Sequence, residues 1–166
     1  MKIAVIGSGA IGALVAGYLK LGGEDVLLAG RGESIAAIRA KGLNISGVRG
    51  NFNINIPVEE RITSPADVVI LATKTQDIQE ALEGNLKLLK GSVILTTQNG
   101  VRAEKIVSGY LPEENIISSI VMFGSTYLKP AEIVHNFEGS WILGRFSGIG
   151  TDTGVVALSK LLDKAF

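Results

Sequence analysis

Residues 2–19 read KIAVIGSGAIGALVAGYL, and this stretch decides the fold. Its first five residues, Lys2–Ile6, are mostly apolar and predict a short buried strand. Helical periodicity follows over Ala10–Leu21, and Gly22-Gly23 then gives a stop signal. The pattern G-x-G-x-x-G lies between the two, at residues 7–12. A strand that turns through this pattern into a helix is typical of a dinucleotide-binding β-α-β unit.

The three glycines of this motif have separate physical roles. Gly7 permits the tight turn, Gly9 has no Cβ and lets a pyrophosphate approach the backbone, and Gly12 lets the helix pack closely on the strand. The free N–H groups and the positive dipole end of the helix then attract phosphates. A glycine-rich turn without a ligand is the structural alternative. We expect the whole motif to bind cofactor, namely Gly7, Ser8, Gly9, Ala10, Ile11 and Gly12.

The end of the second predicted strand, Asp25–Ala29, suggests which dinucleotide binds. In NAD-specific domains an acid at this point binds the ribose hydroxyls, but here the chain continues with Gly30 and Arg31. Glu24 stands at the wrong end of the strand. A carboxylate would repel the 2′-phosphate of NADP, whereas an arginine pairs with it. We therefore expect an NADP(H) preference set by Arg31, with a solvated surface arginine as the alternative.

Composition narrows the remaining classes of function. The 166 residues suit one domain, and 46% hydrophobic against 19% charged residues argues against disorder. Sixteen basic and sixteen acidic residues give a net charge of zero, so we expect neither nucleic acid nor an anionic membrane as partner. The chain has no cysteine, which excludes disulfides and thiol catalysis, and with one histidine, His135, we expect no metal site.

The apolar start of the chain also resembles a signal peptide. Glycines at motif spacing interrupt that run, and helical periodicity continues beyond it, so we favour the β-α-β reading. No other apolar run reaches the roughly 18 residues that a membrane span needs. We expect a cytoplasmic protein.

Strands and helices alternate along the rest of the chain, which predicts parallel β-α-β units. The predicted fold is α/β: a Rossmann-type, doubly wound, mostly parallel sheet with helices on both faces, in a single domain over residues 1–166. The further elements that we expect are helices at Ser34–Ala40, Thr75–Leu89, Ala103–Tyr110 and Val155–Lys164, strands at Asp67–Ala72, Ser92–Thr97 and Ile116–Met122, a hairpin of Leu43–Ser46 with Phe52–Ile56, and two β-rich pieces at residues 132–137 and 140–146.

Several short motifs carry a family resemblance. TKTQD at residues 73–77 follows one predicted strand, and QNGV at residues 98–101 follows the next. IVH at 133–135 and ILG at 142–144 come later. Together with the glycine motif and the AGR of residues 29–31, these make the whole chain resemble the ketopantoate reductase (2-dehydropantoate 2-reductase) family. The resemblance implies NADPH-dependent reduction of a 2-keto acid, ketopantoate, to pantoate, in the synthesis of pantothenate and coenzyme A.

Two further site residues follow from strand ends. Lys74 and Asn99 lie just past the carboxyl ends of predicted parallel strands, where ligands of open α/β sheets bind. Lys74 supplies a cation, and Asn99 can donate to and accept from a ribose or a substrate hydroxyl. The resemblance implies that both line the cofactor and substrate cleft, with Asn99 positioning the reactants. The alternatives are a solvated lysine and an ordinary Asn-Gly turn. Gln98 and Gly100 are weaker candidates, and we interpret His135 as structural.

The chain departs from the family in one respect. Family members continue into a helical second half that supplies the general-acid lysine, and neither Lys160 nor Lys164 matches it. We therefore expect a cofactor domain that binds NADPH but turns over poorly without this C-terminal domain. Surface meant for that domain could drive homodimer formation. Two alternatives stay open: another NADP-linked hydroxyacid dehydrogenase on the same scaffold, and a regulatory nucleotide-sensing module, which Arg31 and both loops argue against.

Overall fold

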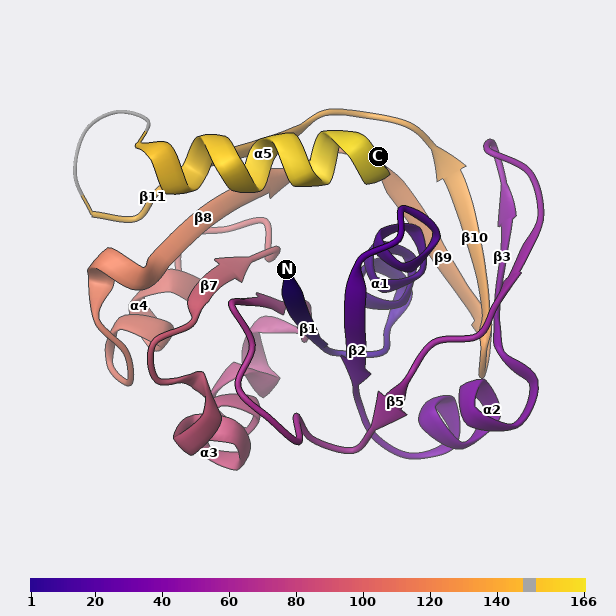
Figure 1. Ribbon diagram of the computed structural model, residues 1–166, viewed down its shortest axis with the longest axis horizontal. Coiled ribbons are helices and arrows are strands. Elements are labelled where there is room, and N and C mark those ends of the chain that lie inside the picture. Colours follow the sequence, from indigo (N-terminus) through magenta and orange to yellow (C-terminus); the bar gives the residue numbers. More distant parts are fainter. Residues whose placement is uncertain (148–151) are drawn as a thin grey trace.

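The computed structural model describes residues 1–147 and 152–166. Within them, one sheet has the strand order β11-β8-β7-β6-β1-β2-β5 (Figure 1). Every neighbouring pair is parallel except β8 with β11, which is antiparallel at one edge. The chain order reverses at β1, as in a doubly wound sheet. The strand bounds are β1 Lys2–Ile6, β2 Asp25–Ala29, β5 Val58–Glu59, β6 Val68–Leu71, β7 Val93–Thr96, β8 Ile116–Val121 and β11 Trp141–Arg145.

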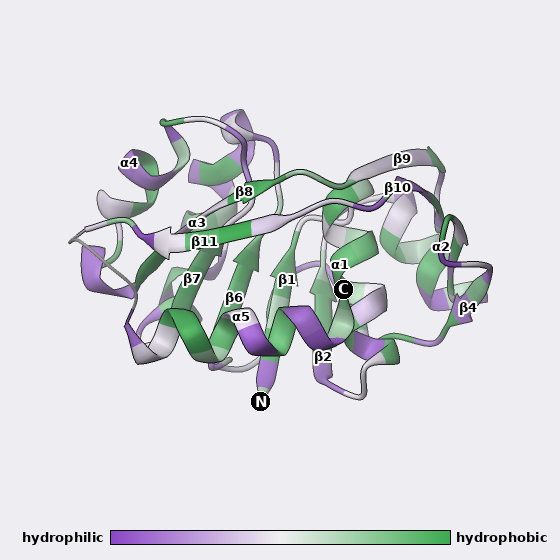
Figure 2. Ribbon diagram, turned by 90° about the horizontal axis from the view of Figure 1, so that it is seen from above, coloured by the Kyte–Doolittle hydropathy of each residue, from purple (hydrophilic) through white to green (hydrophobic). Residues whose placement is uncertain are grey.

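Helices cover both faces of this sheet, which explains the unbroken apolar strands. Ile3 and Val5 belong to the core under the helices α1 and α5, whereas Ala4 and Ile6 face the core under α3 and α4. The central strands are accordingly hydrophobic along their length (Figure 2). The helix bounds are α1 Ala10–Leu21, α2 Glu33–Lys41, α3 Ile78–Leu89, α4 Ala103–Ser108 and α5 Thr153–Ala165.

A second sheet, with the order β4-β3-β10-β9, was not predicted from the sequence. The expected hairpin is confirmed as the antiparallel pair β3–β4. The two predicted β-rich pieces, at residues 132–137 and 140–146, correspond to the strands β10 and β11, which belong to different sheets. The helix α1 contacts strands of both sheets and lies between them (Figure 1). The bounds are β3 Leu43–Gly47, β4 Phe52–Ile54, β9 Gly124–Lys129 and β10 Glu132–Phe137.

The four later predicted helices all have different bounds in the structure. Two are longer than predicted, with Ser34–Ala40 extended to Glu33–Lys41 and Val155–Lys164 extended to Thr153–Ala165. The predicted helix Thr75–Leu89 begins as a 3₁₀ turn, Thr75–Asp77, and α3 follows from Ile78. The predicted helix Ala103–Tyr110 ends at Ser108, where Gly109 caps it. A further 3₁₀ turn covers Glu113–Asn115.

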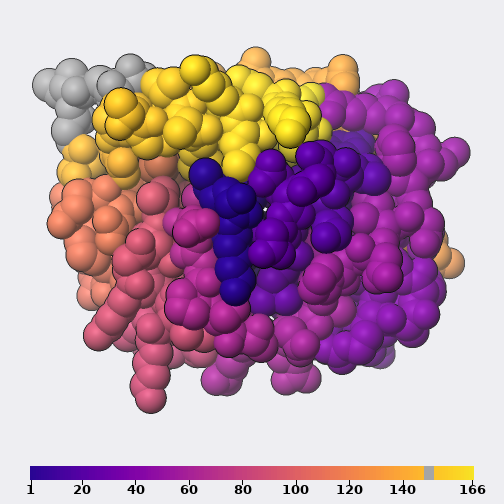
Figure 3. Space-filling view, viewed as in Figure 1, coloured from indigo at the N-terminus to yellow at the C-terminus, as the bar shows by residue number. Residues whose placement is uncertain are grey.

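The two ends of the described chain lie on the same side of the molecule. In Figure 3 the last helix, α5, packs directly above the first residues of β1. Among the described helices, none has both the length and the apolar character that crossing a membrane requires.

Candidate functional site

A cleft of about 400 Å³ opens at the carboxyl ends of β1, β2 and β6. Its size suits a small-molecule site. It collects most of the site residues expected from sequence: Gly7, Ser8, Gly9, Arg31 and Lys74. Ala10, Ile11 and Gly12 form the first turn of α1 behind this lining. Asn99 lies in a neighbouring hollow.

The glycine motif has the geometry that a phosphate-binding turn needs. Gly7 has φ +118°, and a Cβ there would lie 2.6 Å from the carbonyl carbon of Ala72. A Cβ at Gly12 would clash with the carbonyl oxygen of Gly7, so the missing side chain lets α1 approach β1. A Cβ at Gly9 would meet nothing within 4 Å. The backbone of Gly9 is therefore open to a ligand.

The start of α1 is electrostatically suited to an anion. Gly9 is its N-cap, and no side chain within the described residues caps the helix there. The first turn contains no acidic residue. The N–H groups of this turn and the positive end of the helix dipole are therefore available to phosphates.

Arg31 extends from the end of β2 into the same cleft. Its guanidinium forms an ion pair with the carboxylate of Glu80, which α3 supplies. The hydrogen bond that Arg31 donates to Glu80, and then the negative charge of Glu80, raise the pKa of Arg31. Gly30 allows this strand end to approach the glycine motif, because a Cβ at Gly30 would clash with the Ser8 side chain. Arg31 thus reaches the cleft, but it already has an anionic partner.

The loops after β6 and β7 are tied together beside the cleft. The Gln98 amide donates to the carbonyl oxygens of Leu71 and Thr73, at 2.9 and 2.6 Å. Thr73 Oγ1 and Gln98 Oε1 are buried and have no hydrogen-bond partner within the described residues. Because unpaired buried polar atoms are costly, these two atoms fit a site that receives a polar ligand.

Asn99 has a clear structural role. Its Nδ2 donates to the carbonyl oxygen of Val121 at 2.9 Å, and the Val121 N–H donates to its Oδ1 at 3.0 Å. These paired bonds fix the loop after β7 to the end of β8. The side chain borders a hollow of about 330 Å³ with Thr75 and Gln98. It keeps one further N–H and one lone pair for a ligand.

Sequence reasoning missed several charged and polar residues of the cleft. Those at the start of α3 follow β6, so the same strand-end rule that found Lys74 extends to them. The pair after β5 gave no comparable signal, because β5 is only two residues long. The missed residues are Gln76 and Asp77 just before α3, Glu80 in its first turn, and Glu60 and Arg61 after β5.

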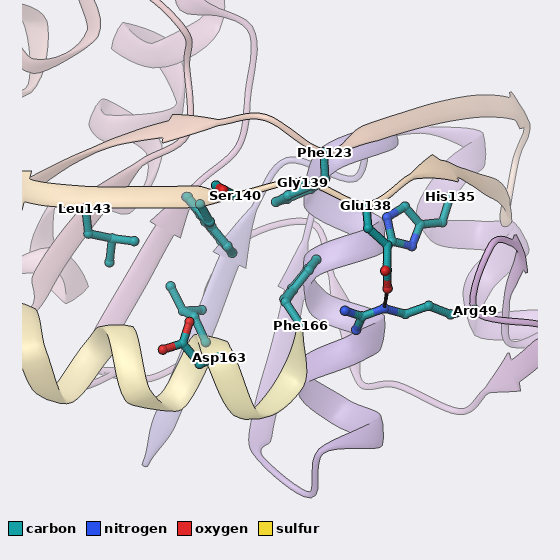
Figure 4. Close-up of a pocket in the computed structure, with 11 residues that line it drawn as sticks. Arg49, Phe123, His135, Glu138, Gly139, Ser140, Leu143, Asp163 and Phe166 are labelled. Carbon is teal, nitrogen blue, oxygen red and sulfur yellow. Dashed lines mark hydrogen bonds and ion pairs between the residues drawn. The ribbon is translucent and has the colours of Figure 1, made fainter.

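A second cavity, of about 320 Å³, shares no lining residue with this cleft. Figure 4 shows Arg49, paired with Glu138 at 2.6 Å, and His135 close together at one end of it. His135 is 1% exposed, and its Nδ1 is hydrogen-bonded to the Tyr18 hydroxyl at 2.8 Å. Burial, and then the charge of Arg49, lower the pKa of His135, so the ring is neutral at pH 7. This packing agrees with the structural interpretation of His135.

The family model described as ketopantoate reductase PanE/ApbA matches residues 3–148. The chain belongs to this family. It is 36% identical over 147 residues to a 2-dehydropantoate 2-reductase of Pyrococcus abyssi, covering 88% of this chain and 48% of that relative. It is 26% identical over 152 residues to the same enzyme of Halobacterium salinarum, covering 89% of this chain and 50% of the relative. The chain thus spans about half the length of these curated relatives.

Solved structures agree with this membership. The 2-dehydropantoate 2-reductase of Geobacter metallireducens has a TM-score of 0.89 at 29% identity, covering 99% of this chain and 56% of that one. A D-mandelate dehydrogenase solved with NADH and anilino(oxo)acetate also has a TM-score of 0.89, at 26% identity, covering 99% of this chain and 54% of that one. This chain therefore shares its Rossmann fold with both proteins, and one of them, the D-mandelate dehydrogenase, was solved with a nicotinamide cofactor, NADH.

Proposed function

We propose that residues 1–166 are the NADPH-binding domain of a 2-dehydropantoate 2-reductase-like oxidoreductase, which reduces a 2-keto acid to a 2-hydroxy acid. The observation that carries the proposal is the single cleft that contains Gly7, Gly9, Arg31 and Lys74. Family membership supports the reaction class.

Each residue has a definite task in this proposal. The α1 N-terminus and Gly9 hold the pyrophosphate, because N–H groups and an open backbone face it. Arg31 pairs with the 2′-phosphate. Lys74 holds a phosphate or the substrate carboxylate, and Asn99 uses its remaining N–H and lone pair to position the nicotinamide ribose or the substrate. The bound nicotinamide supplies the hydride.

Reduction of a ketone also needs a proton donor at the carbonyl oxygen. We propose that the helical second half of the family supplies this donor, so the 166-residue chain binds cofactor but does not turn over. An apolar patch supports such a partner domain. Ile120 of β8 and Ile142 of β11 are directly paired and remain 54% and 52% exposed. Self-association through this patch would give a homodimer of the isolated chain.

The second candidate is another hydroxyacid dehydrogenase on this scaffold. The likeness to a D-mandelate dehydrogenase solved with NADH favours it. It differs from the first proposal in substrate. A regulatory nucleotide-sensing module has no comparable observation in its favour.

The test is a calorimetric titration of the chain with NADPH and, separately, with NADH. We expect NADPH to bind at least about tenfold more tightly, and Arg31→Ala to remove that preference. Equal affinities in the parent chain, or an Arg31→Ala variant with an unchanged ratio, would contradict the role of Arg31. Measurable reduction of ketopantoate by the isolated chain would contradict the missing proton donor.

A further inference from the structure

We infer that Glu80, acting with Arg31, sets the selectivity of this cleft between NADPH and NADH. The inference rests on the proposed function, namely that the cleft binds a nicotinamide dinucleotide. The sequence has no acid at the end of β2, where such domains often carry one. The structure provides an acid from another element, because Glu80 lies in the first turn of α3 and its carboxylate contacts the Arg31 guanidinium.

The two side chains favour opposite ligands. An ionised carboxylate only accepts hydrogen bonds, so Glu80 can receive the ribose hydroxyls of NADH but repels a 2′-phosphate. Arg31 only donates, so it pairs with that phosphate. A 2′-phosphate can pair with Arg31 only if the Arg31–Glu80 ion pair breaks, whereas a ribose with free hydroxyls can bind while this ion pair stays formed. Glu80 therefore makes the NADPH preference smaller than Arg31 alone would give.

Glu80 differs from the other acidic residues of the cleft in its ion pair with Arg31. Asp77 and Glu60 also line the cleft, but the ion pair of Arg31 within the described residues is with Glu80. Both side chains of this pair are mostly exposed, 62% for Arg31 and 69% for Glu80. Exposed ion pairs are weak, so a ligand phosphate can replace the carboxylate at a small cost. The expected effect is a change of several-fold in each affinity.

The test is Glu80→Gln, which keeps the shape of the side chain and removes its charge. Its matched control is Glu83→Gln on the same helix, because Glu83 is exposed, bonds to Gln79 and Tyr110, and does not line the cleft. Each variant is titrated with NADPH and with NADH. We expect Glu80→Gln to bind NADPH about threefold more tightly and NADH about threefold more weakly, so that the ratio shifts about tenfold. The control should leave both affinities unchanged.

The opposite signs for the two nucleotides separate selectivity from a merely structural role, which would weaken both. Thermal unfolding of the ligand-free variants checks that they are folded. A ratio within about twofold of the parent value in Glu80→Gln would overturn the role of Glu80. If Arg31→Ala still removes the NADPH preference in that case, the proposed function stands. A parent chain that binds neither nucleotide would overturn the proposed function and this inference together.

Discussion

Gly9 and Gly12 belong to the same motif, yet the structure gives them separable tasks. A Cβ at Gly12 would clash with the Gly7 carbonyl oxygen and would lie 3.0 Å from the Cβ of Ala72. These neighbours are backbone and a short side chain, so α1 itself must move. We expect Gly12→Ala to lower the free energy of unfolding by about 1–3 kcal/mol, the usual cost of overpacking, measured by urea denaturation.

Gly9→Ala is the matched variant. Nothing lies within 4 Å of the added Cβ, so only the weaker N-capping by alanine affects stability, and the free energy of unfolding should fall by less than about 1 kcal/mol. The methyl group would instead project toward the bound pyrophosphate and weaken NADPH binding at least about tenfold. Equal effects of Gly9→Ala and Gly12→Ala on stability, or unimpaired NADPH binding by Gly9→Ala, would contradict this division of tasks.

Single residues also show how far the sequence predicts the site. The sequence predicts the glycines, Arg31 and Lys74 as cleft residues, because each follows the carboxyl end of a strand and ligands of open α/β sheets bind at that edge. The partner of Arg31 could not be found in this way. Glu80 lies 49 residues further along the chain in α3, and only the packing of this helix brings its carboxylate to Arg31. The two backbone bonds of Asn99 to Val121 likewise depend on contacts 22 residues apart.

At the scale of elements, local signals predicted the central strands and most helices correctly. Apolar runs and glycine stops are local, and they identify β1, α1, β2, β6 and β7. The second sheet escaped prediction because β3 pairs with β10, so that Asn44 lies beside Glu132. No local pattern indicates a pairing at this distance. The second sheet packs on α1 as a third layer, and Gly17 of α1 leaves room for it. The sequence contains this glycine, but its role is visible only in the structure.

Gly17 faces the second sheet from α1. A Cβ there would clash with Ile45 Cδ1 and would lie 3.1 Å from Ile54 Cδ1. We expect Gly17→Ala to destabilise the parent chain by about 1 kcal/mol, because overpacking exceeds the gain in helix propensity. Ile45→Val removes the clashing Cδ1. In that background Gly17→Ala should be neutral or stabilising by up to about 1 kcal/mol, a coupling that a double-mutant cycle measures. Additive effects would contradict the contact.

At the scale of the whole molecule, a buried polar contact joins α1 to the second sheet. The Tyr18 hydroxyl is bonded to His135 of β10, and the C-terminal Phe166 packs against Tyr18 with ring centroids 5.3 Å apart. The guanidinium of Arg49 lies 5.3 Å from the centre of the Tyr18 ring and donates to the carbonyl oxygen of Ala165. The Tyr18–His135 hydrogen bond thus links α1 to the second sheet, and the contacts of Phe166 and Arg49 add the end of α5 to this cluster.

This link predicts how stability depends on pH. Burial and then the charge of Arg49 lower the folded-state pKa of His135 below its usual 6.5, although the backbone of Phe137 and then the charge of Glu138 oppose the shift. Between the lowered pKa and about pH 6.5, His135 is therefore protonated in more of the unfolded chains than of the folded chains. Stability is full above about pH 6.5 and falls as the pH drops from there toward the lowered pKa. Urea denaturation at pH 7.5 and 5.5 should show a lower free energy of unfolding at the lower pH.

His135→Gln isolates this effect, because the chain has one histidine and Asp and Glu side chains in general have reference pKa values of about 4. The variant should be less stable at pH 7.5, since it loses the imidazole that meets the Tyr18 hydroxyl. Its free energy of unfolding should nevertheless change little between pH 7.5 and 5.5. If the free energy of unfolding of the variant fell between pH 7.5 and 5.5 as much as that of the parent chain, other groups would cause the pH dependence. That result would contradict a neutral, buried His135 as the residue that joins α1 to the second sheet.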